Sequence, residues 1–166
     1  ANSGAAFQGS MINVKKEVLV KSLEVNFYSH HNIVQKIANI MVSQGFGGSI
    51  SLNLSKQSIN PGKDFGPYGI AKASSLFSMK QYALEFGKYN IRVNGINADR
   101  IKSGLLTDQF IKERAKARNM SANEYLNNNL LQKQVTAEDV AEVFFAQLSF
   151  EKTTGNIITV DGGNIE

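Results

Sequence analysis

Hydrophobic residues recur with helical spacing from about Val18 to Ser43. Several of them can share one broad apolar face, as an amphipathic helix requires. These residues are Val25, Val34, Ile37, Ile40 and Met41. Glycine-rich stretches at residues 1–10 and at Gly45–Gly48 border the segment and indicate a loop before it and a stop after it. The pattern predicts one long helix.

The pattern changes to alternation after these glycines. Residues Ser49–Ser55 place Ile50, Leu52 and Leu54 at every second position, which is the period of a strand. A polar loop follows over residues 56–66. Pro67 then suits the first turn of a helix, where a missing N–H costs nothing, and good helix formers continue to about Lys88. The sequence therefore predicts a strand, a loop and a second helix.

The remaining chain repeats this order with shorter segments. Residues 91–96 have the pattern of a second strand, and helical segments are expected near 107–118 and 121–131. Thr136-Ala-Glu-Asp139 has the form of a capping box and opens a helix that runs to about Ser149. Residues 156–160 are expected to form the last strand.

Helices that separate successive strands favour parallel pairing, so the fold class is expected to be α/β with a parallel layered sheet. One domain over residues 1–166 accounts for the length. Phe144 and Phe145 are expected to fill the core beneath the last helix.

Composition and charge narrow the class of protein. The net charge is +4 and the isoelectric point about 9.3, but the basic residues are scattered. Lys112, Arg114, Lys116 and Arg118 alternate along a helical segment and would wrap around its axis, which favours a solvated helix surface over a phosphate-binding patch for nucleic acid. The chain has no cysteine and no long apolar run, so no disulfide framework or membrane span is expected, and the default location is the cytoplasm.

Tyr68-Gly-Ile-Ala-Lys72 is the first candidate for chemistry. Residues four apart in a helix lie on one face, so the phenol and the ammonium are neighbours. A positive charge near a phenol favours the phenolate and lowers its pKa, which a base that oxidises an alcohol requires. Ser55 ends the preceding strand 13 residues before Tyr68 and could meet the phenol at the carboxyl edge of the sheet, where open α/β sheets bind ligands.

Several further motifs occur around this pair in a fixed order. They are Asn2-Ser-Gly4, Asn26, Gly48-Ser-Ile-Ser-Leu-Asn-Leu-Ser55, Ile91-Arg-Val-Asn94 and Asp161-Gly-Gly163. Together with the 13-residue step from Ser55 to Tyr68, they resemble the short-chain dehydrogenase/reductase family over nearly the whole chain. The resemblance implies the C-terminal half of a Rossmann-like, doubly wound parallel sheet.

The resemblance also implies roles for individual residues. Tyr68 would be the acid/base, Lys72 would lower its pKa and hold the nicotinamide ribose, and Ser55 would orient the substrate oxygen. Asn26 would anchor a water that relays the proton.

The same resemblance places a nicotinamide cofactor against Asn2, Gly4, Tyr68 and Lys72. Where the family usually has Pro-Gly after its sixth strand this chain has Ala98-Asp99. Ile101 and Ser103 are therefore the candidates for contact with the nicotinamide carboxamide.

Shorter runs resemble the dehydrogenase module of bifunctional rhamnulose-1-phosphate aldolase/alcohol dehydrogenases. These runs are Ser55-Lys56-Gln57, Asn97-Ala-Asp99, Leu130-Leu-Gln-Lys-Gln-Val135, Thr154-Gly-Asn156 and Asp161-Gly-Gly-Asn164. This resemblance implies lactaldehyde or a related small hydroxyaldehyde as the substrate. It implies NAD as the cofactor, with NADP not excluded.

The family's first strand, glycine-rich turn and helix, which hold the pyrophosphate, have no counterpart in residues 1–166. Weak or absent cofactor binding by this chain is therefore expected, and a catalytically inert fragment is the alternative to an oxidoreductase. In the family's strand order, strand 49–54 would also have a bare edge, which predicts association with other copies.

Two adjacent histidines, His30 and His31, point in different directions on a helix and cannot form an i, i+4 metal pair. A surface or interface role is expected for both. No metal site is predicted.

Overall fold

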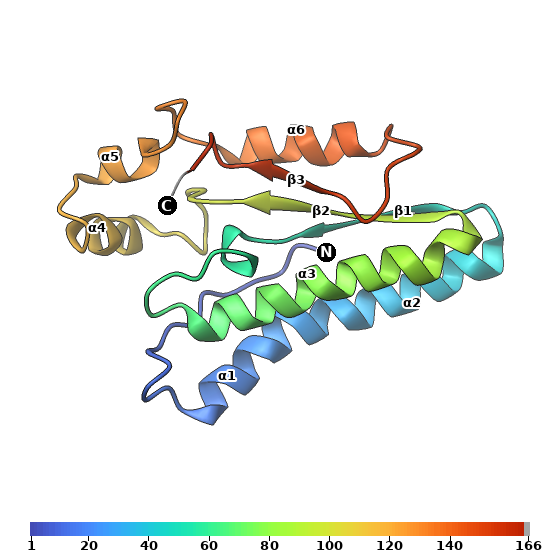
Figure 1. The fold of residues 1–166 in the computed structure, drawn as a ribbon, viewed down its shortest axis with the longest axis horizontal. Helices are drawn as coiled ribbons and strands as arrows, with labels where there is room; N and C mark the ends of the chain where they lie inside the picture. The colour runs from blue at the N-terminus through green and yellow to red at the C-terminus, as the bar shows by residue number, and fades with distance from the viewer. Residues whose placement is uncertain (165–166) are drawn as a thin grey trace.

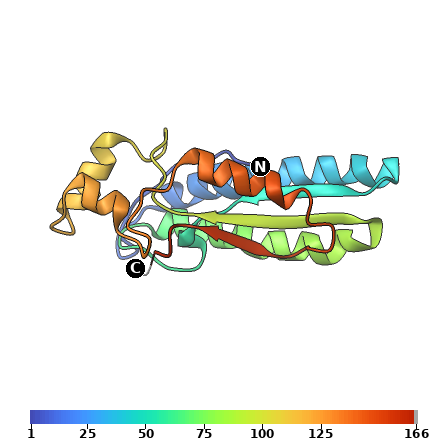
Figure 2. The same cartoon turned by 90° about the horizontal axis from the view of Figure 1, so that it is seen from above.

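The computed structural model describes residues 1–164. A three-stranded parallel sheet in the order β1-β2-β3 has α2 and α3 on one face and α6 on the other (Figures 1 and 2). The strands are β1 (Gly48–Asn53), β2 (Ile91–Ala98) and β3 (Ile157–Val160), with Gly48 opposite Ile91 and Gly95 opposite Ile157. The predicted α/β class and parallel pairing are confirmed.

The long helix predicted from 18 to 43 is interrupted by one π-helical turn. It consists of α1 (Lys16–Leu23), the π turn η1 (Glu24–Tyr28) and α2 (Ser29–Gln44). Gly45 ends it in the left-handed conformation, with φ 70°.

The apolar face predicted for this helix is only partly buried. Val34 packs in the core, but the side chains of Ile37 and Ile40 are 40% and 51% exposed. The predicted face was therefore too broad.

The second helix, α3 (Gly66–Phe86), carries Pro67 in its first turn, as predicted. Short 3₁₀ turns, η2 (Lys56–Ser58) and η3 (Gly87–Tyr89), lie before and after it. Beyond β2 come α4 (Asp108–Lys116), α5 (Ala122–Asn127) and α6 (Ala137–Gln147). The predicted capping box between Thr136 and Asp139 is confirmed, because each side chain accepts the backbone N–H of the other residue.

Alternation along β2 divides the core between the two faces of the sheet. Ile91 and Val93 pack with α2 and α3, whereas Ile96 faces α6 together with Val140. Gly95 leaves room for the Leu54 side chain, since a Cβ there would lie 2.5 Å from Leu54 Cδ1. The face of the sheet covered by α2 and α3 carries the larger hydrophobic cluster.

The two phenylalanines of α6 differ in burial. Phe144 packs against the α6 side of the sheet, as predicted. Phe145 is 78% exposed, so the prediction that it fills the core was wrong. Adjacent helical residues point about 100° apart, and only one of them can face the sheet.

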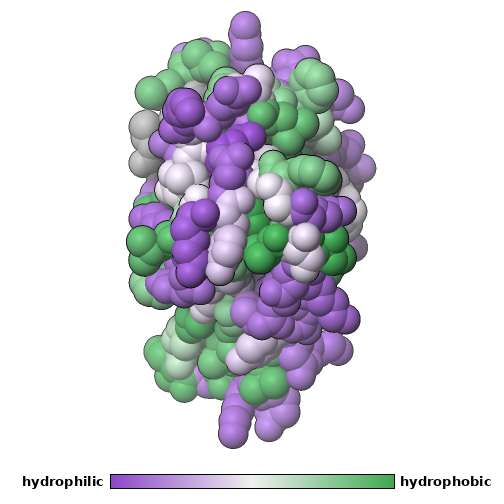
Figure 3. Space-filling view, turned by 90° about the vertical axis from the view of Figure 1, so that its right-hand side faces the viewer, coloured by the Kyte–Doolittle hydropathy of each residue, from purple (hydrophilic) through white to green (hydrophobic). Residues whose placement is uncertain are grey.

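The two ends of the sheet are seen in Figures 1 and 3. At the end where the strands begin, hydrophilic and hydrophobic residues form a mosaic (Figure 3). The carboxyl ends of the strands instead point toward α4 and α5 (Figure 1). Within residues 1–164, no helix combines the length and apolar character needed to cross a bilayer.

The N-terminal segment lies along the free edge of β1. The Ala1 ammonium donates to Ser51 O at 2.8 Å, and the Asn53 N–H donates to Ala1 O at 3.0 Å. Ala1 therefore occupies the position of a parallel neighbour beside the second half of β1.

Two buried side chains of the long helix fix the next few residues. The Asn26 amide accepts from Ala5 N and donates to Ala5 O, both at 3.0 Å. His30 Nε2 lies 2.7 Å from Ser3 O, and because a carbonyl only accepts, Nε2 carries the proton. His30 is 1% exposed, so the expected surface role was wrong.

Burial lowers the pKa of His30 from 6.5 to about 4, and the charge of Lys72 acts in the same direction. The unfolded chain therefore binds a proton as the pH falls from 6.5 toward 4, whereas the folded chain resists it. We expect the free energy of unfolding to fall over this window by on the order of 2 kcal/mol on account of His30.

Denaturant titrations at several pH values would measure this effect. His30→Gln, which keeps a donor for Ser3 O, should lose that part of the pH dependence, while His31→Gln should retain it. An identical pH profile for His30→Gln and the parent would contradict the assignment.

Candidate active site

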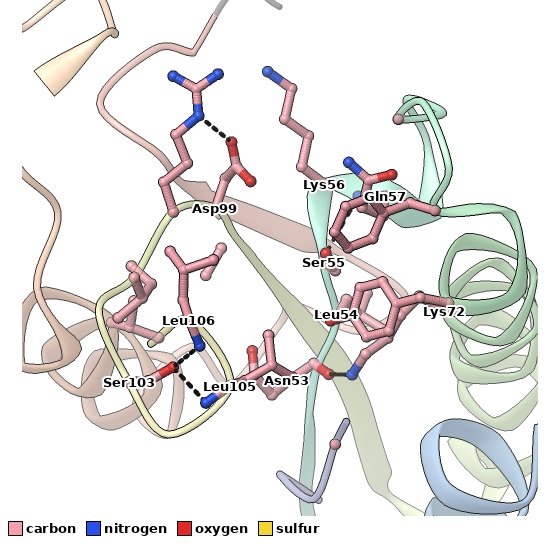
Figure 4. Close-up of a pocket in the computed structure, with 18 of the residues that line it drawn as sticks. Asn53, Leu54, Ser55, Lys56, Gln57, Lys72, Asp99, Ser103, Leu105 and Leu106 are labelled. Carbon is pink, nitrogen blue, oxygen red and sulfur yellow. Dashed lines mark hydrogen bonds and ion pairs between the residues drawn. The ribbon is translucent and has the colours of Figure 1, made fainter. Parts of the chain in front are cut away.

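A cleft of about 700 Å³ opens at the carboxyl edge of the sheet (Figure 4). The end of β1, the first turns of α3, the loop after β2 and α4 all contribute to its walls. This is the edge at which parallel α/β sheets bind ligands. The cleft therefore contains residues that are far apart in the sequence.

Tyr68 lies in the first turn of α3 and is 8% exposed. Its ring packs edge-on against Phe65, with centroids 6.2 Å apart. Burial raises the pKa of Tyr68, a hydrogen bond with the Ser55 side chain acts in the opposite direction, and the charge of Asp99 raises it further. The direction is opposite to the one expected from Lys72, so Tyr68 is a phenol at neutral pH.

Lys72 lies one turn further along α3 and is 3% exposed. Its Nζ donates to Asn53 O at 3.0 Å and lies 5.8 Å from the centroid of the Tyr68 ring. Burial lowers the pKa of Lys72 to about 8. The predicted Tyr68–Lys72 neighbourhood is thus present, and the ammonium uses one of its three donors on Asn53.

Ser55 follows the end of β1 and is 7% exposed. Its Oγ accepts the Gln57 N–H at 3.2 Å and so caps the turn Lys56–Ser58. Asn53, Ser55 and Lys72 project toward the cleft in Figure 4. The structure brings Ser55 to Tyr68 as the 13-residue spacing predicts.

Asn26 does not line the cleft. Besides Ala5, its side chain binds Ser22 O at 3.1 Å, and its own carbonyl accepts from Ser75 Oγ at 2.9 Å. Asn26 therefore holds neighbouring segments of the chain together behind the cleft. The water-anchoring role stays a prediction, and the second lone pair of the Asn26 carbonyl would have to serve it.

Asn2 and Gly4 line the wall of the cleft nearest β1. Asn2 Oδ1 accepts from Asn53 Nδ2 at 2.6 Å, and a Cβ on Gly4 would lie 3.2 Å from Asn26 Oδ1. Gly4 thus packs closely against Asn26 behind the cleft wall, and the turn itself borders the cleft. Together with the two unused donors of Lys72, it fits the ribose end of a nicotinamide cofactor.

The two candidates for carboxamide contact also line the cleft. Ile101 packs against the cluster beneath α6. The Ser103 Oγ accepts from the N–H groups of Leu105 and Leu106, at 3.3 Å each, and so stabilises its own loop (Figure 4). Their contact with a cofactor stays a prediction.

A polar network around Asp99 was not predicted. Arg100 Nε lies 3.7 Å from Asp99 Oδ2, Asn164 donates to the same oxygen, and Lys56 Nζ donates to Asn164 O at 2.9 Å. Burial raises the pKa of Asp99 although Arg100 and Lys56 lower it. The signal for this network in the sequence was Ala98-Asp99, at the place where the family usually has Pro-Gly. The negative charge of Asp99 also raises the pKa of Tyr68.

An aromatic and basic wall was also missed. Phe65 contacts Phe110 with ring centroids 5.9 Å apart, and the Arg114 guanidinium lies 4.8 Å from the centroid of Phe65. Arg118 lies over Tyr125 at 5.5 Å. Arg114 and Arg118 are half-buried in the cleft wall, so the prediction of a solvated surface was wrong for these two. Arg114 lies in the last turn of α4, and Arg118 lies in the turn that follows it.

The family model described as enoyl-(acyl carrier protein) reductase matches residues 1–164. A protein of Bacillus subtilis, "Uncharacterized oxidoreductase YuxG", is 35% identical over 74% of this chain and 19% of its own length. D-erythrulose reductase of Gallus gallus is 28% identical over 98% of this chain and 64% of its own. The enoyl-[acyl-carrier-protein] reductase [NADH] FabI of Buchnera aphidicola is 31% identical over 95% and 58%.

Among solved structures, a short-chain type dehydrogenase/reductase from Mycobacterium ulcerans is 29% identical, with a TM-score of 0.84 over 97% of this chain and 57% of its own. The chain thus spans less than two thirds of the length of these relatives. The site geometry, the family model and these likenesses agree. The chain belongs to the short-chain dehydrogenase/reductase family of oxidoreductases.

Proposed function

We propose that this chain carries the proton-transfer and substrate-binding groups of an NAD(P)-dependent oxidoreductase that interconverts an alcohol and a carbonyl. The observation that carries the proposal is the buried Tyr68, with Ser55 and Lys72 beside it, in the cleft at the carboxyl edge of the sheet. Each of these residues has a defined part in the chemistry.

Tyr68 is protonated at neutral pH, so in the reductive direction its hydroxyl donates a proton to the substrate oxygen. Ser55 donates a hydrogen bond to the same oxygen and orients it. The Lys72 ammonium, near the Tyr68 ring, stabilises the phenolate left behind. The bound nicotinamide supplies the hydride. In oxidation, the same phenolate accepts the alcohol proton.

The proposed cofactor is NAD, with NADP not excluded. Support comes from the turn at Asn2–Gly4 and the free donors of Lys72, and from a relative whose name specifies NADH. We propose further that residues 1–166 are the C-terminal part of a short-chain dehydrogenase domain, since relatives of known name are longer. Cofactor binding by this chain alone is then weak.

The proposed substrate is a small hydroxycarbonyl compound. The resemblance to the dehydrogenase module of rhamnulose-1-phosphate aldolase/alcohol dehydrogenases makes lactaldehyde the first to test. A relative named for the reduction of D-erythrulose supports the same size class. The match to about a fifth of a much longer oxidoreductase is compatible with a module of a larger protein. The cytoplasmic location stays a prediction.

Association of copies is also part of the proposal, through α2 and α3 instead of the β1 edge expected from the sequence, because Ala1 lies along the second half of that edge. Ile33, Ile37 and Ile40 are exposed on α2, and Ile70, Phe77 and Leu84 are exposed on α3 at intervals of seven. These two helices lie against one another. Apolar stripes on adjacent helices form the kind of patch that interfaces cover.

Replacing Tyr68 by Phe removes the proton donor but keeps the ring. In the full polypeptide that carries this chain, we expect turnover of NADH with lactaldehyde or D-erythrulose to fall by about 10²- to 10⁴-fold. NADH binding, measured by isothermal titration, should change little. Tyr89→Phe, outside the cleft, is the matched control and should retain activity. Full activity in Tyr68→Phe would exclude the mechanism, and no turnover by the 166-residue chain where the full polypeptide is active would favour the inert fragment.

Replacing Phe77 by Glu places a charge in the exposed stripe of α3. We expect light scattering to show a smaller particle than the parent, because the charge would have to be buried in the interface. Glu142→Lys alters an exposed charge on α6, on the opposite face of the sheet, and should leave the mass unchanged. A parent protein that is monomeric at all concentrations would refute this interface.

A further inference from the structure

The cleft has a strong excess of positive charge. Six basic side chains line it, against the single carboxylate of Asp99. The basic residues are Lys56, Lys63, Lys72, Arg100, Arg114 and Arg118. A cleft lined by one sign of charge concentrates ligands of the opposite sign. A basic side chain can bind an anionic ligand only if its donors are not already used within the protein.

Most of the buried cations bind other parts of the protein. Lys72 donates to Asn53 O and Lys56 to Asn164 O. Arg100 pairs with Asp99 and donates to two backbone carbonyls. Arg118 donates to a backbone carbonyl and lies over Tyr125. These side chains hold the walls of the cleft together.

Arg114 differs from them. Its guanidinium lies 4.8 Å from the centroid of the Phe65 ring, and within residues 1–164 it donates no hydrogen bond and forms no ion pair. A guanidinium stacked on a ring keeps its N–H donors at the edge, in a fork that matches a carboxylate or a phosphate. The half-buried side chain is thus held in place with its donors unused.

Phe65 connects this guanidinium to the reacting centre. The Phe65 ring contacts Tyr68 with centroids 6.2 Å apart and Arg114 at 4.8 Å. Arg114 therefore lies one aromatic side chain away from the proposed acid/base. This separation suits two ends of one small molecule, with the reacting oxygen at Tyr68 and an anionic group at Arg114.

The proposed cofactor wall involves different contacts. Asn2 binds Asn53, which in turn accepts from Lys72. Arg114 instead contacts Phe65 and belongs to α4, on the side of the loop after β2. Because the two groups share no partner, the charge of Arg114 is available to the substrate.

We propose that the site takes an alcohol or carbonyl substrate that carries a carboxylate or phosphate, and that Arg114 binds this anionic group. This proposal rests on the proposed function, because it concerns the substrate of the same site. It also makes neutral lactaldehyde a poorer ligand than an anionic compound of similar size.

Equilibrium binding tests this proposal without turnover. Glycerol 3-phosphate, glycerate and uncharged glycerol are titrated into the 166-residue chain by isothermal titration or ligand-observed NMR. We expect at least one anion to bind more tightly than glycerol, and the tighter of the two identifies the anionic group. Arg114→Met, which keeps an apolar cover on Phe65, should weaken that binding by about tenfold or more.

Two further variants separate the fork from general charge. Arg114→Lys keeps the charge but loses the paired donors, and should bind the anion with intermediate affinity. Lys112→Met removes a cation from the exposed side of the same helix and should bind it like the parent. Circular dichroism establishes that each variant is folded.

Several results would overturn the proposal. They are failure of both anions to bind better than glycerol, parent-like anion binding by folded Arg114→Met, and equal weakening by Lys112→Met. In the full polypeptide, a loss of NADH binding alone in Arg114→Met would also overturn it, by assigning the guanidinium to the cofactor. The activity of Tyr68→Phe is independent of all these readings, so failure of the proposed function is distinguishable.

Discussion

The packing of α3 against β1 and β2 is the contact on which the site depends. Met79 of α3 is fully buried against the sheet, where it packs in one cluster with Ile91 and Val93. The first turns of α3 consequently lie against the end of β1, where Lys72 reaches the Asn53 carbonyl. Removing an ammonium from water is costly unless it is hydrogen-bonded, so this carbonyl offsets part of the cost. The cost that remains is seen in the pKa of Lys72, which burial lowers.

The long helix α1–η1–α2 supports the wall of the cleft beside the end of β1. Asn26 lies in a π-helical turn, the kind of interruption that is frequent at functional sites, and His30 follows one turn later. Both side chains bind the backbone of residues 3–5, which carries no regular hydrogen bonding of its own. The cleft wall at Asn2–Gly4 is therefore supported by side chains that never face the ligand.

Electrostatics then divides the cleft into two parts. Around Tyr68, burial and the Asp99 charge keep the phenol protonated. Beyond Phe65, Arg114 supplies a positive charge that no described carboxylate neutralises. A proton donor at one end and a cation at the other favour a substrate whose polar groups are similarly separated. The fold brings both to the carboxyl edge, where parallel strands end together.

The sequence by itself determined the order of elements, the parallel sheet and the proximity of Tyr68 and Lys72, because these follow from short-range periodicity. The spacing to Ser55 also predicted a meeting that the structure contains. Tertiary structure alone decided burial: it covered His30, exposed Phe145 and set the direction of the Tyr68 pKa. The tertiary structure also placed Arg114 in the wall of the cleft. Each of these depends on what packs against a side chain from distant parts of the chain, and local patterns do not contain that information.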